Sequence, residues 1–224
     1  MAEMMKGNEA IAEAAIRAGA RFYAGYPITP SSEIMEYLSW RMNEVGGAFV
    51  QAESELAGIN MVIGASSCGV RALTASSGPG ISLKQEGIST LCDEGLPAVV
   101  ITQVRYGNGL GTLFTSQCDY HRETRGGGQG DYRCIVLCPS SIQEFVDLML
   151  PAYELAEKYR IVTIMMGEGT LGQMMEPVEL PDFVEPKRTP WLKWPLHIQE
   201  DWYLRKRFYA EAVELRAKYA RSKK

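Results

Sequence analysis

The residues most able to do chemistry lie at turns that each follow a short β-like run and open a helical pattern. Glu55 follows one of these runs, and Ser77, Gly78, Pro79 and Gly80 follow the next. In an open parallel sheet such turns meet at the carboxyl ends of the strands, where ligands bind. A shielded acid there suits proton transfer to a heterocycle. Two glycines beside a stiff proline suit the close approach of a flat ring, so the sequence predicts a ligand site at this edge.

Each of these residues also has a structural interpretation. Glu55 would be a partly solvated acid stabilised by the dipole of its helix, and Ser77 to Gly80 would be an ordinary tight turn. Thr29 is either a helix cap or a hydroxyl donor to a substrate carboxylate. Arg105 emerges from an apolar run at the same edge, where it pairs with an internal carboxylate or grips a substrate acid with two hydrogen bonds. Residue type and spacing leave these alternatives open.

Strands and helices alternate along most of the chain, which predicts the scaffold for these turns. Runs with strand character cover 21–25, 48–52, 70–75, 97–103, 134–137 and 161–165. This alternation predicts an α/β fold with a doubly wound parallel sheet and helices on both faces. We expect Pro30 at a first helical position and Ser54 as a helix cap. In the helix after Ser54, we expect Leu56, Ile59 and Ile63 to share the buried face.

A long segment from residue 105 to 130 interrupts the alternation. It holds seven glycines, and a loop of this length inside a compact domain is usually functional. The glycines are weak indications of phosphate binding, because neither group follows the first strand as a dinucleotide-binding fingerprint would. Cys118 and His121, with Cys134 and Cys138, could form a four-ligand zinc site. The alternative that we favour places Cys134 and Cys138 on either side of a buried strand.

The composition excludes several classes of protein. With 224 residues, 46% of them hydrophobic, the chain suits one sizeable α/β domain plus an appendage. Its net charge of -4 implies no bulk attraction to nucleic acid. Because no apolar run is long enough to span a bilayer and no signal peptide is evident, we expect a cytoplasmic protein without a membrane partner. Five irregularly spaced cysteines predict reduced thiols and no iron–sulfur cluster on this chain.

The composition changes after residue 180. We therefore predict an α/β domain over residues 1–180 and a separate extension over residues 181–224. The extension is rich in proline and tryptophan, which favours extended backbone, and its last part has the pattern of a basic amphipathic helix. That helix either folds back onto the acidic domain or docks on a partner, and we predict contact with a neighbouring subunit.

Four motifs, in unbroken order, resemble the α subunit of 2-oxoacid:ferredoxin oxidoreductases. They are Tyr26-Pro-Ile-Thr-Pro-Ser-Ser32, Gln51-Ala-Glu-Ser-Glu-Leu-Ala57, Thr74-Ala-Ser-Ser-Gly-Pro-Gly80 and Gly126-Gly-Gly-Gln-Gly-Asp-Tyr-Arg133. A further stretch, Leu171-Gly-Gln-Met-Met-Glu-Pro-Val178, looks most like the branched-chain, or 2-oxoisovalerate, type. The resemblance implies the pyrimidine-binding domain of a thiamine diphosphate enzyme that oxidatively decarboxylates a 2-oxoacid.

The resemblance also implies roles for individual residues. Glu55 would hydrogen-bond N1′ of the aminopyrimidine and promote the imino tautomer that deprotonates the thiazolium C2. Ser77, Gly78, Pro79 and Gly80 would flank the pyrimidine. Thr29 and Arg105 would contact the substrate carboxylate. Carbon dioxide would then leave, two electrons would pass to ferredoxin, and coenzyme A would accept the acyl group.

By the same resemblance the chain is one subunit of a hetero-oligomer. A β subunit would hold the diphosphate and its Mg²⁺, in keeping with the lack of a Gly-Asp-Gly motif with a downstream Asn in this sequence. The γ and iron–sulfur δ-type subunits would complete the complex, and only partner subunits would carry iron–sulfur clusters. No residue of this chain is expected to bind a metal.

Two departures from the family pattern leave questions open. Residues 104–109 differ from the usual loop that contains Gly-Pro, which leaves the substrate undetermined. The second domain of the family does not follow, so a split subunit, a truncated form and a lineage without that domain are all compatible with the sequence. A non-oxidative thiamine-dependent decarboxylase subunit and a non-catalytic assembly or regulatory paralogue are the alternative functions.

Overall fold

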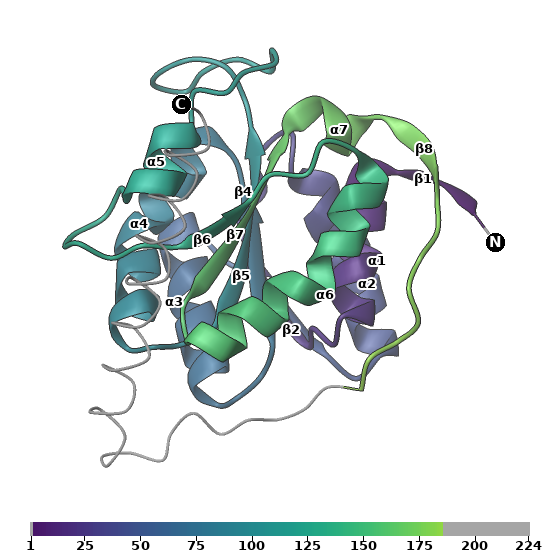
Figure 1. Cartoon of the computed structure of the whole chain (residues 1–224), viewed down its shortest axis with the longest axis horizontal. Coiled ribbons are helices and arrows are strands. Elements are labelled where there is room, and N and C mark those ends of the chain that lie inside the picture. The colour runs from purple at the N-terminus through teal and green to yellow at the C-terminus, as the bar shows by residue number, and fades with distance from the viewer. Residues whose placement is uncertain (1, 186–224) are drawn as a thin grey trace, which may run out of the picture.

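The computed structural model describes residues 2–185, whose centre is a parallel sheet of six strands (Figure 1). The strand order is β3-β2-β4-β5-β7-β6. The bounds are β2 (Phe22–Gly25), β3 (Ala48–Gln51), β4 (Ala72–Ser76), β5 (Ala98–Val104), β6 (Ile135–Leu137) and β7 (Val162–Glu168). Every neighbouring pair in this sheet is parallel. β4 and β5 are buried along their whole length, as expected for strands covered on both faces.

Helices cover both faces of the sheet, so the doubly wound architecture is confirmed. One core cluster joins the sheet to α1 (Gly7–Arg17), α2 (Ser32–Glu44) and α6 (Ile142–Tyr159). A second cluster joins the other face to α3 (Glu55–Ser67) and α4 (Gly78–Asp93). Figure 1 shows these two groups of helices on opposite sides of the strands. The division of the chain at residue 180 stays a prediction.

Local sequence explains where several of these helices begin. The Ser54 hydroxyl accepts a hydrogen bond from the Ala57 amide at 3.2 Å, so the predicted cap of α3 is confirmed. The expectation for Pro30 is wrong, because α2 begins at Ser32. The expectation for Leu56 is wrong as well, since this side chain is 44% exposed. The buried face of α3 instead consists of Glu55, Gly58, Ile59, Val62 and Ser66.

A small antiparallel ribbon at the edge of the molecule was not predicted from the sequence. It pairs β1 (Glu3–Lys6) with β8 (Met175–Val178), which follows α7 (Gly169–Gln173). Each strand has four residues, too few to produce a convincing alternation of apolar and polar positions. The ribbon depends on pairing between segments that are distant in sequence, so no local pattern could reveal it.

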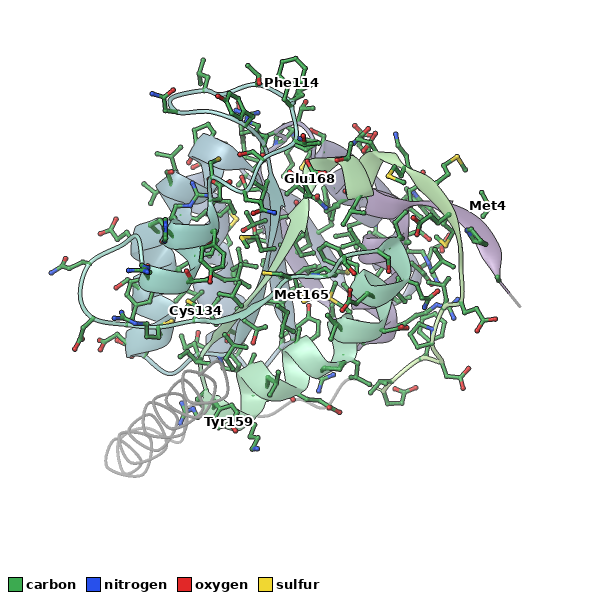
Figure 2. The ribbon with its side chains drawn as sticks, turned by 45° about the horizontal axis from the view of Figure 1, so that its top comes forward. Met4, Phe114, Cys134, Tyr159, Met165 and Glu168 are labelled. Carbon is green, nitrogen blue, oxygen red and sulfur yellow. The ribbon has the colours of Figure 1, made fainter. Side chains whose placement is uncertain are left out.

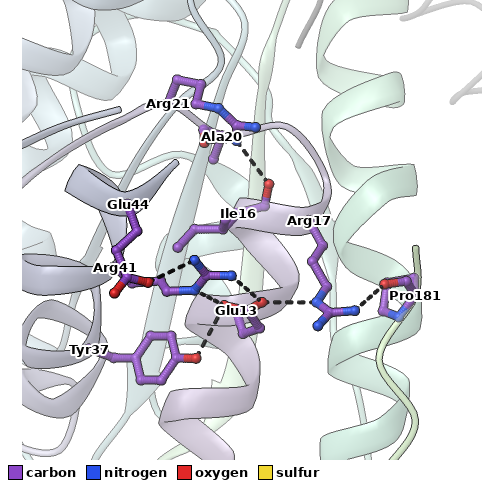
Figure 3. Close-up of polar contacts among 9 residues, drawn as sticks. All are labelled: Glu13, Ile16, Arg17, Ala20, Arg21, Tyr37, Arg41, Glu44 and Pro181. Carbon is purple, nitrogen blue, oxygen red and sulfur yellow. Dashed lines mark hydrogen bonds and ion pairs between the residues drawn. The ribbon is translucent and has the colours of Figure 1, made fainter. Parts of the chain in front are cut away.

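Glu13 connects several parts of this side of the molecule (Figure 3). Its buried carboxylate accepts hydrogen bonds from Arg17 at 2.9 Å, from Arg41 at 3.0 Å and from the Tyr37 hydroxyl at 3.1 Å. Arg17 also donates to the Pro181 carbonyl at 2.8 Å. Because every buried oxygen of Glu13 has a charged or polar donor, this network joins α1 to α2 and to the segment after β8.

The remaining predictions concern the loop and the tail. The segment after β5 is not a loop throughout, because it contains the short helix α5 (Tyr120–Arg125). β6 is an edge strand and only half-buried, so the expectation of a buried strand there is wrong. The predicted C-terminal helix and most of the proline-rich extension lie outside the described residues. No helix within residues 2–185 is long and apolar enough to cross a membrane.

Candidate functional site

The candidate site lies where the order of the strands reverses. β2 sits between β3 and β4, so the chain leaves β2 for one side of the sheet and then crosses to the other. In open α/β sheets this reversal opens a ligand-binding region outside the carboxyl ends of the strands. The segments after β2, β3, β4 and β5 all begin at this edge, and they carry Thr29, Glu55, Ser77 to Gly80 and Arg105 respectively.

Glu55 is the buried acid of the site. It is the first residue of α3, and only 6% of its surface is exposed. This burial contradicts the interpretation of Glu55 as a partly solvated residue of a helix start. A Cβ at position 80 would lie 2.6 Å from Oε1 of Glu55, so the carboxylate lies directly against the backbone of Gly80. Position 80 therefore has room for glycine alone while the acid keeps this position.

The turn from Ser77 to Gly80 presents backbone rather than side chains. Gly78 has a φ of +45°, and a Cβ there would lie 3.0 Å from Nε of Arg105. The turn is closed by a 2.9 Å hydrogen bond from the Gly80 amide to the Ser77 carbonyl. The hydroxyls of Ser76 and Ser77 are buried and have no hydrogen-bond partner among the described residues. Buried hydroxyls normally find a partner, so these two groups retain unused hydrogen-bonding capacity at this turn.

Arg105 and Thr29 lie together on the other side of this turn. Arg105 follows β5, is half-buried and donates a 2.8 Å hydrogen bond to the Thr29 carbonyl. It forms no ion pair with a carboxylate in the described part of the chain, contrary to the structural alternative. The Thr29 residue is exposed. The structure thus brings the residues predicted for the site into one continuous row from Glu55 through Gly80 and Gly78 to Arg105 and Thr29.

Arg122 supports this row from α5, and the sequence analysis did not identify it. It donates to the Gly78 carbonyl at 3.0 Å and to the Ser82 hydroxyl at 3.1 Å. Asp119 and Glu123 form ion pairs with the same guanidinium at 3.2 and 2.9 Å. Arg122 therefore fastens the loop after β5 to the turn that faces Glu55. Its contacts with the turn are 44 and 40 residues away in the chain, so no local pattern indicates its role.

The burial of Glu123 produces a testable pH dependence. Burial raises the pKa of this carboxyl to about 7, although the neighbouring Arg122 opposes the shift. The unfolded chain releases the proton near the ordinary value of 4.5. Because the folded state holds the proton more tightly, folding becomes less favourable as the pH rises between these two values. The two values correspond to a loss of roughly 3 kcal/mol.

We expect the substitution Glu123→Gln to remove this part of the pH dependence. The thermal midpoint of the wild-type protein should fall as the pH rises from the acidic side of this window to neutrality, and that of the variant should fall less. The exposed Glu94 at the end of α4 provides the matched control, Glu94→Gln. An equal fall in the wild-type and Glu123→Gln proteins would show that Glu123 does not titrate in this range.

A second polar network holds the turn that carries Thr29. The buried Asn8 donates to the Pro30 carbonyl at 2.7 Å and to Glu33 at 2.6 Å. Gln173 donates to the same two groups at 3.1 and 2.6 Å, and Lys6 forms an ion pair with Glu33. The turn after β2 is therefore fixed by residues from both ends of the described chain. A buried asparagine was the only local sign of this network.

The glycine-rich segment before β6 packs on α4. A Cβ at position 127 would lie 2.6 Å from Oε1 of Gln85, and one at position 128 would lie 2.4 Å from the Gln85 carbonyl. The amides of Gly127 and Gly128 donate to the Tyr132 hydroxyl, which itself donates to Gln85 at 2.9 Å. Close packing against Gln85 explains why positions 127 and 128 are glycine. The amides of these two residues already donate to the Tyr132 hydroxyl.

The residues of the zinc alternative do not form a metal site in the structure. Cys134 lies 3.8 Å from Cys92, and Cys118 contacts the Arg105 carbonyl at the other end of the loop. Among residues 2–185, no group of three or more histidine, cysteine and acidic side chains could hold a metal ion. The four residues of the sequence pattern therefore belong to different surroundings.

The arrangement fits the aminopyrimidine of a thiamine cofactor. A buried carboxylate stands beside the backbone of a turn with two glycines, and two hydroxyls without a partner in the described part of the chain lie at the start of the same turn. An acid of this kind can share a proton with a ring nitrogen, and the bare backbone permits a planar ring to approach. Glu55, Ser76 and Ser77 are the polar groups that such a ring would meet.

Sequence comparison identifies the class of protein that this fold and site define. Residues 13–197 match the family described as "Pyruvate flavodoxin/ferredoxin oxidoreductase, thiamine diP-bdg". The chain belongs to this thiamine diphosphate-binding family, and the resemblance drawn from the four motifs is confirmed.

Two relatives are similar to this chain over most of its length. The ketoisovalerate oxidoreductase subunit VorB of Methanothermobacter marburgensis is 53% identical over 180 residues, which are 80% of this chain and 51% of that protein. The 2-oxoglutarate synthase subunit KorA of Methanocaldococcus jannaschii is 46% identical over 184 residues, which are 82% of this chain and 50% of that protein. The chain thus spans about half the length of the curated relatives that it matches.

A solved structure has the same fold. It is the 2-oxoglutarate:ferredoxin oxidoreductase from Magnetococcus marinus with 2-oxoglutarate, coenzyme A and succinyl-CoA bound. The TM-score is 0.80 at 31% sequence identity, and the match covers 87% of this chain and 34% of that chain. The six-stranded parallel sheet with helices on both faces is therefore the fold of this class of oxidoreductases.

Proposed function

We propose that this chain is a subunit of a 2-oxoacid:ferredoxin oxidoreductase that converts a 2-oxoacid and coenzyme A into acyl-CoA and carbon dioxide. The observation that carries the proposal is the buried carboxylate of Glu55 against the backbone of Gly80, at the edge that also holds Arg105 and Thr29. Membership of the thiamine diphosphate-binding family supports it. This chain supplies the half of the site that receives the pyrimidine.

When bound, thiamine diphosphate supplies a nucleophilic carbon and an electron sink for decarboxylation. Glu55 holds the proton that it shares with N1′ of the pyrimidine, and its burial keeps water from competing for that proton. Ser77, Gly78, Pro79 and Gly80 line the ring, since glycine at positions 78 and 80 leaves the backbone accessible. The backbone of Gly80 in this turn packs against the carboxylate of Glu55 and so helps to hold it in position.

The substrate carboxylate is assigned to Arg105 and Thr29. The guanidinium of Arg105 has a planar set of donors that matches a carboxylate. In the structure two of these donors bond to backbone carbonyls, of Thr29 at 2.8 Å and of Leu110 at 2.5 Å, which a substrate carboxylate would replace. The Thr29 hydroxyl is exposed on the adjoining turn. These donors lie at the same edge as Glu55, so they can orient the acid group of the substrate while its oxo group faces the cofactor.

The rest of the complex is assigned to partner chains. We propose that a β subunit holds the diphosphate and Mg²⁺, that γ and δ-type subunits complete the assembly, and that only partners carry the iron–sulfur clusters that reduce ferredoxin.

The loop after β5 supports contact with another chain at this edge, because Leu110 is 79% and Phe114 is 75% exposed. Figure 2 shows Phe114 standing out from this loop, whereas Met165 lies within the sheet. We place the complex in the cytoplasm.

For the substrate, we propose 2-oxoisovalerate or a similar branched-chain 2-oxoacid. The identity to the ketoisovalerate oxidoreductase subunit, 53%, exceeds the 46% identity to the 2-oxoglutarate synthase subunit.

The test is to purify the native complex, identify every partner chain and cofactor, and measure coenzyme A-dependent reduction of ferredoxin with both acids. Aldehyde formation without an electron acceptor would indicate the non-oxidative decarboxylase instead. A complex without thiamine diphosphate would indicate the assembly or regulatory paralogue.

Arg105→Lys tests the contact with the substrate carboxylate. Lysine keeps the positive charge but loses the planar pair of donors. A hydrogen bond between charged groups contributes about 1.5–3 kcal/mol, so KM for the 2-oxoacid should rise by roughly 10- to 150-fold. The affinity for thiamine diphosphate should stay unchanged, because Arg105 is not assigned to the cofactor.

Arg125→Lys is the matched control for this experiment, because Arg125 is exposed at the end of α5. It should leave KM unaltered. If Arg105→Lys also leaves KM unaltered, Arg105 does not bind the substrate carboxylate.

A further inference from the structure

Lys84 is the most unusual buried group near the site. It lies on α4 and is fully buried, with 0% of its surface exposed. Its ammonium donates one hydrogen bond, to the backbone carbonyl of Glu55 at 3.3 Å. No carboxylate among the described residues comes within ion-pair distance of it. A buried ammonium with so few partners is costly, so its retention at this position requires an explanation.

The surroundings place the charge of Lys84 beneath the first turn of α3. A Cβ at position 58 would lie 3.4 Å from Nζ of Lys84 and 3.3 Å from Cα of Gly25. Gly58 therefore creates the space in which the ammonium reaches from α4 toward the end of β2. Burial lowers the pKa of Lys84 to about 8, and the negative charge of Glu55 opposes this shift. The lysine thus remains largely charged at neutral pH and is electrostatically coupled to Glu55.

Other charged or titratable groups near Lys84 act less directly. Tyr23 on β2 packs its hydroxyl against Gly25, and burial raises its pKa, so this group stays neutral. Arg105 lies against Gly78, at the other end of the turn before α4. Glu55 is therefore the acid on which the charge of Lys84 acts.

We propose that Lys84 is a positioning residue for Glu55. Its ammonium holds the Glu55 backbone by a hydrogen bond to the carbonyl. Its positive charge shifts the proton that Glu55 and the pyrimidine share toward the ring nitrogen. The inference rests on the proposed function, because it requires the pyrimidine at Glu55. A positive charge stabilises the carboxylate form of a nearby acid. Because Lys84 bonds to the residue of the acid itself, it favours the state in which Glu55 is ionised and the ring nitrogen is protonated.

Lys84→Met is the direct test, carried out on the complete complex. Methionine has a similar length and fits a buried site without a charge. The readout is the near-ultraviolet circular dichroism of the iminopyrimidine as a function of pH. Removing the charge withdraws the electrostatic interaction between Lys84 and the Glu55 carboxylate, so the acidic limb of this signal should move upward by roughly one pH unit. The acidic limb of kcat should move in the same direction.

Controls separate this role from a structural one. Lys158→Met removes an exposed lysine near the far end of α6 and should not move the limb. Lys84→Gln retains a donor for the Glu55 carbonyl but not the charge, so the acidic limb should move by the same amount. This variant replaces Lys84→Met if the methionine variant does not fold. An unchanged limb in a folded Lys84 variant that binds thiamine diphosphate would overturn the inference.

A double-mutant cycle tests whether Lys84 acts through Glu55. The affinity for thiamine diphosphate is measured for wild type, Lys84→Met, Glu55→Gln and the double variant. The effect of Lys84→Met should largely disappear in the Glu55→Gln protein, since residues that act as a unit are not additive. Fully additive effects would overturn the inference while leaving the proposed function intact. An iminopyrimidine signal that persists in Glu55→Gln would overturn the proposed function and this inference with it.

Discussion

Glu55→Gln is expected to reduce kcat of the complex by about 10²- to 10⁴-fold, the range typical of a lost general acid–base group. Glutamine has nearly the same shape but cannot transfer a proton to the ring nitrogen. The 2-oxoacid is assigned to Arg105 and Thr29, so its binding should change much less than kcat. The measurement is coenzyme A-dependent ferredoxin reduction by the reconstituted complex, together with the thermal midpoint of each variant.

The matched control for this substitution is Glu53→Gln. Glu53 lies two residues earlier, is exposed and precedes α3. Its substitution removes the same charge from the same turn without touching the buried acid, so activity should stay close to that of the wild type. Undiminished ferredoxin reduction by a folded Glu55→Gln complex would remove Glu55 from the mechanism.

Gly80→Ala is expected to have the second-largest effect. The added Cβ would lie 2.2 Å from the Ser76 hydroxyl and 2.6 Å from Oε1 of Glu55, far closer than atoms can pack. Both neighbours are buried, so the carboxylate or the backbone of the turn must move. A misplacement of about 1 Å at a catalytic group can reduce the rate about 10²-fold, and we expect a loss of that order in kcat.

A second glycine-to-alanine variant distinguishes crowding from the general effects of the substitution. Gly64 lies on the exposed side of α3, where a new Cβ would meet nothing within 4 Å. Because alanine favours helix, Gly64→Ala should stabilise the protein by about 0.5–1 kcal/mol and leave activity unaltered. Normal kcat in Gly80→Ala would show that the carboxylate does not need its position against this glycine.

The strands of the central sheet could be predicted because burial on both faces requires apolar residues at successive positions. β5 is the clearest example, since every one of its residues is buried. The start of α2 and the buried face of α3 were predicted less well. Tertiary contacts decided both: Asn8 and Gln173 hold the turn at Pro30, and Leu56 turns away from the sheet so that Glu55 occupies the buried face.

The residues of the candidate site and the sheet edge that they share could be predicted, but not the contacts among them. Glu55, Ser77 to Gly80, Arg105 and Thr29 were recognisable because each stands where an apolar run passes into a helical or loop pattern. Lys84 left a local sign that the sequence analysis did not use, a lysine on the buried face of a helix beside Ile81 and Ile88. Arg122 left none, because Gly78 and Ser82, the two residues through which it reaches the turn, are distant in sequence.

The sequence by itself determined the class of fold, the family and the edge of the sheet at which chemistry would lie, because these follow from periodicity and from short motifs. Only the tertiary structure decided that the acid is buried against Gly80, that a charged lysine lies beneath its helix turn, and that Arg105 forms no ion pair with an acid among residues 2–185. Burial and electrostatic environment arise from residues that become neighbours only on folding. A carboxylate in water and one enclosed within the fold have the same letter in the sequence, but only the fold gives the second its neighbours.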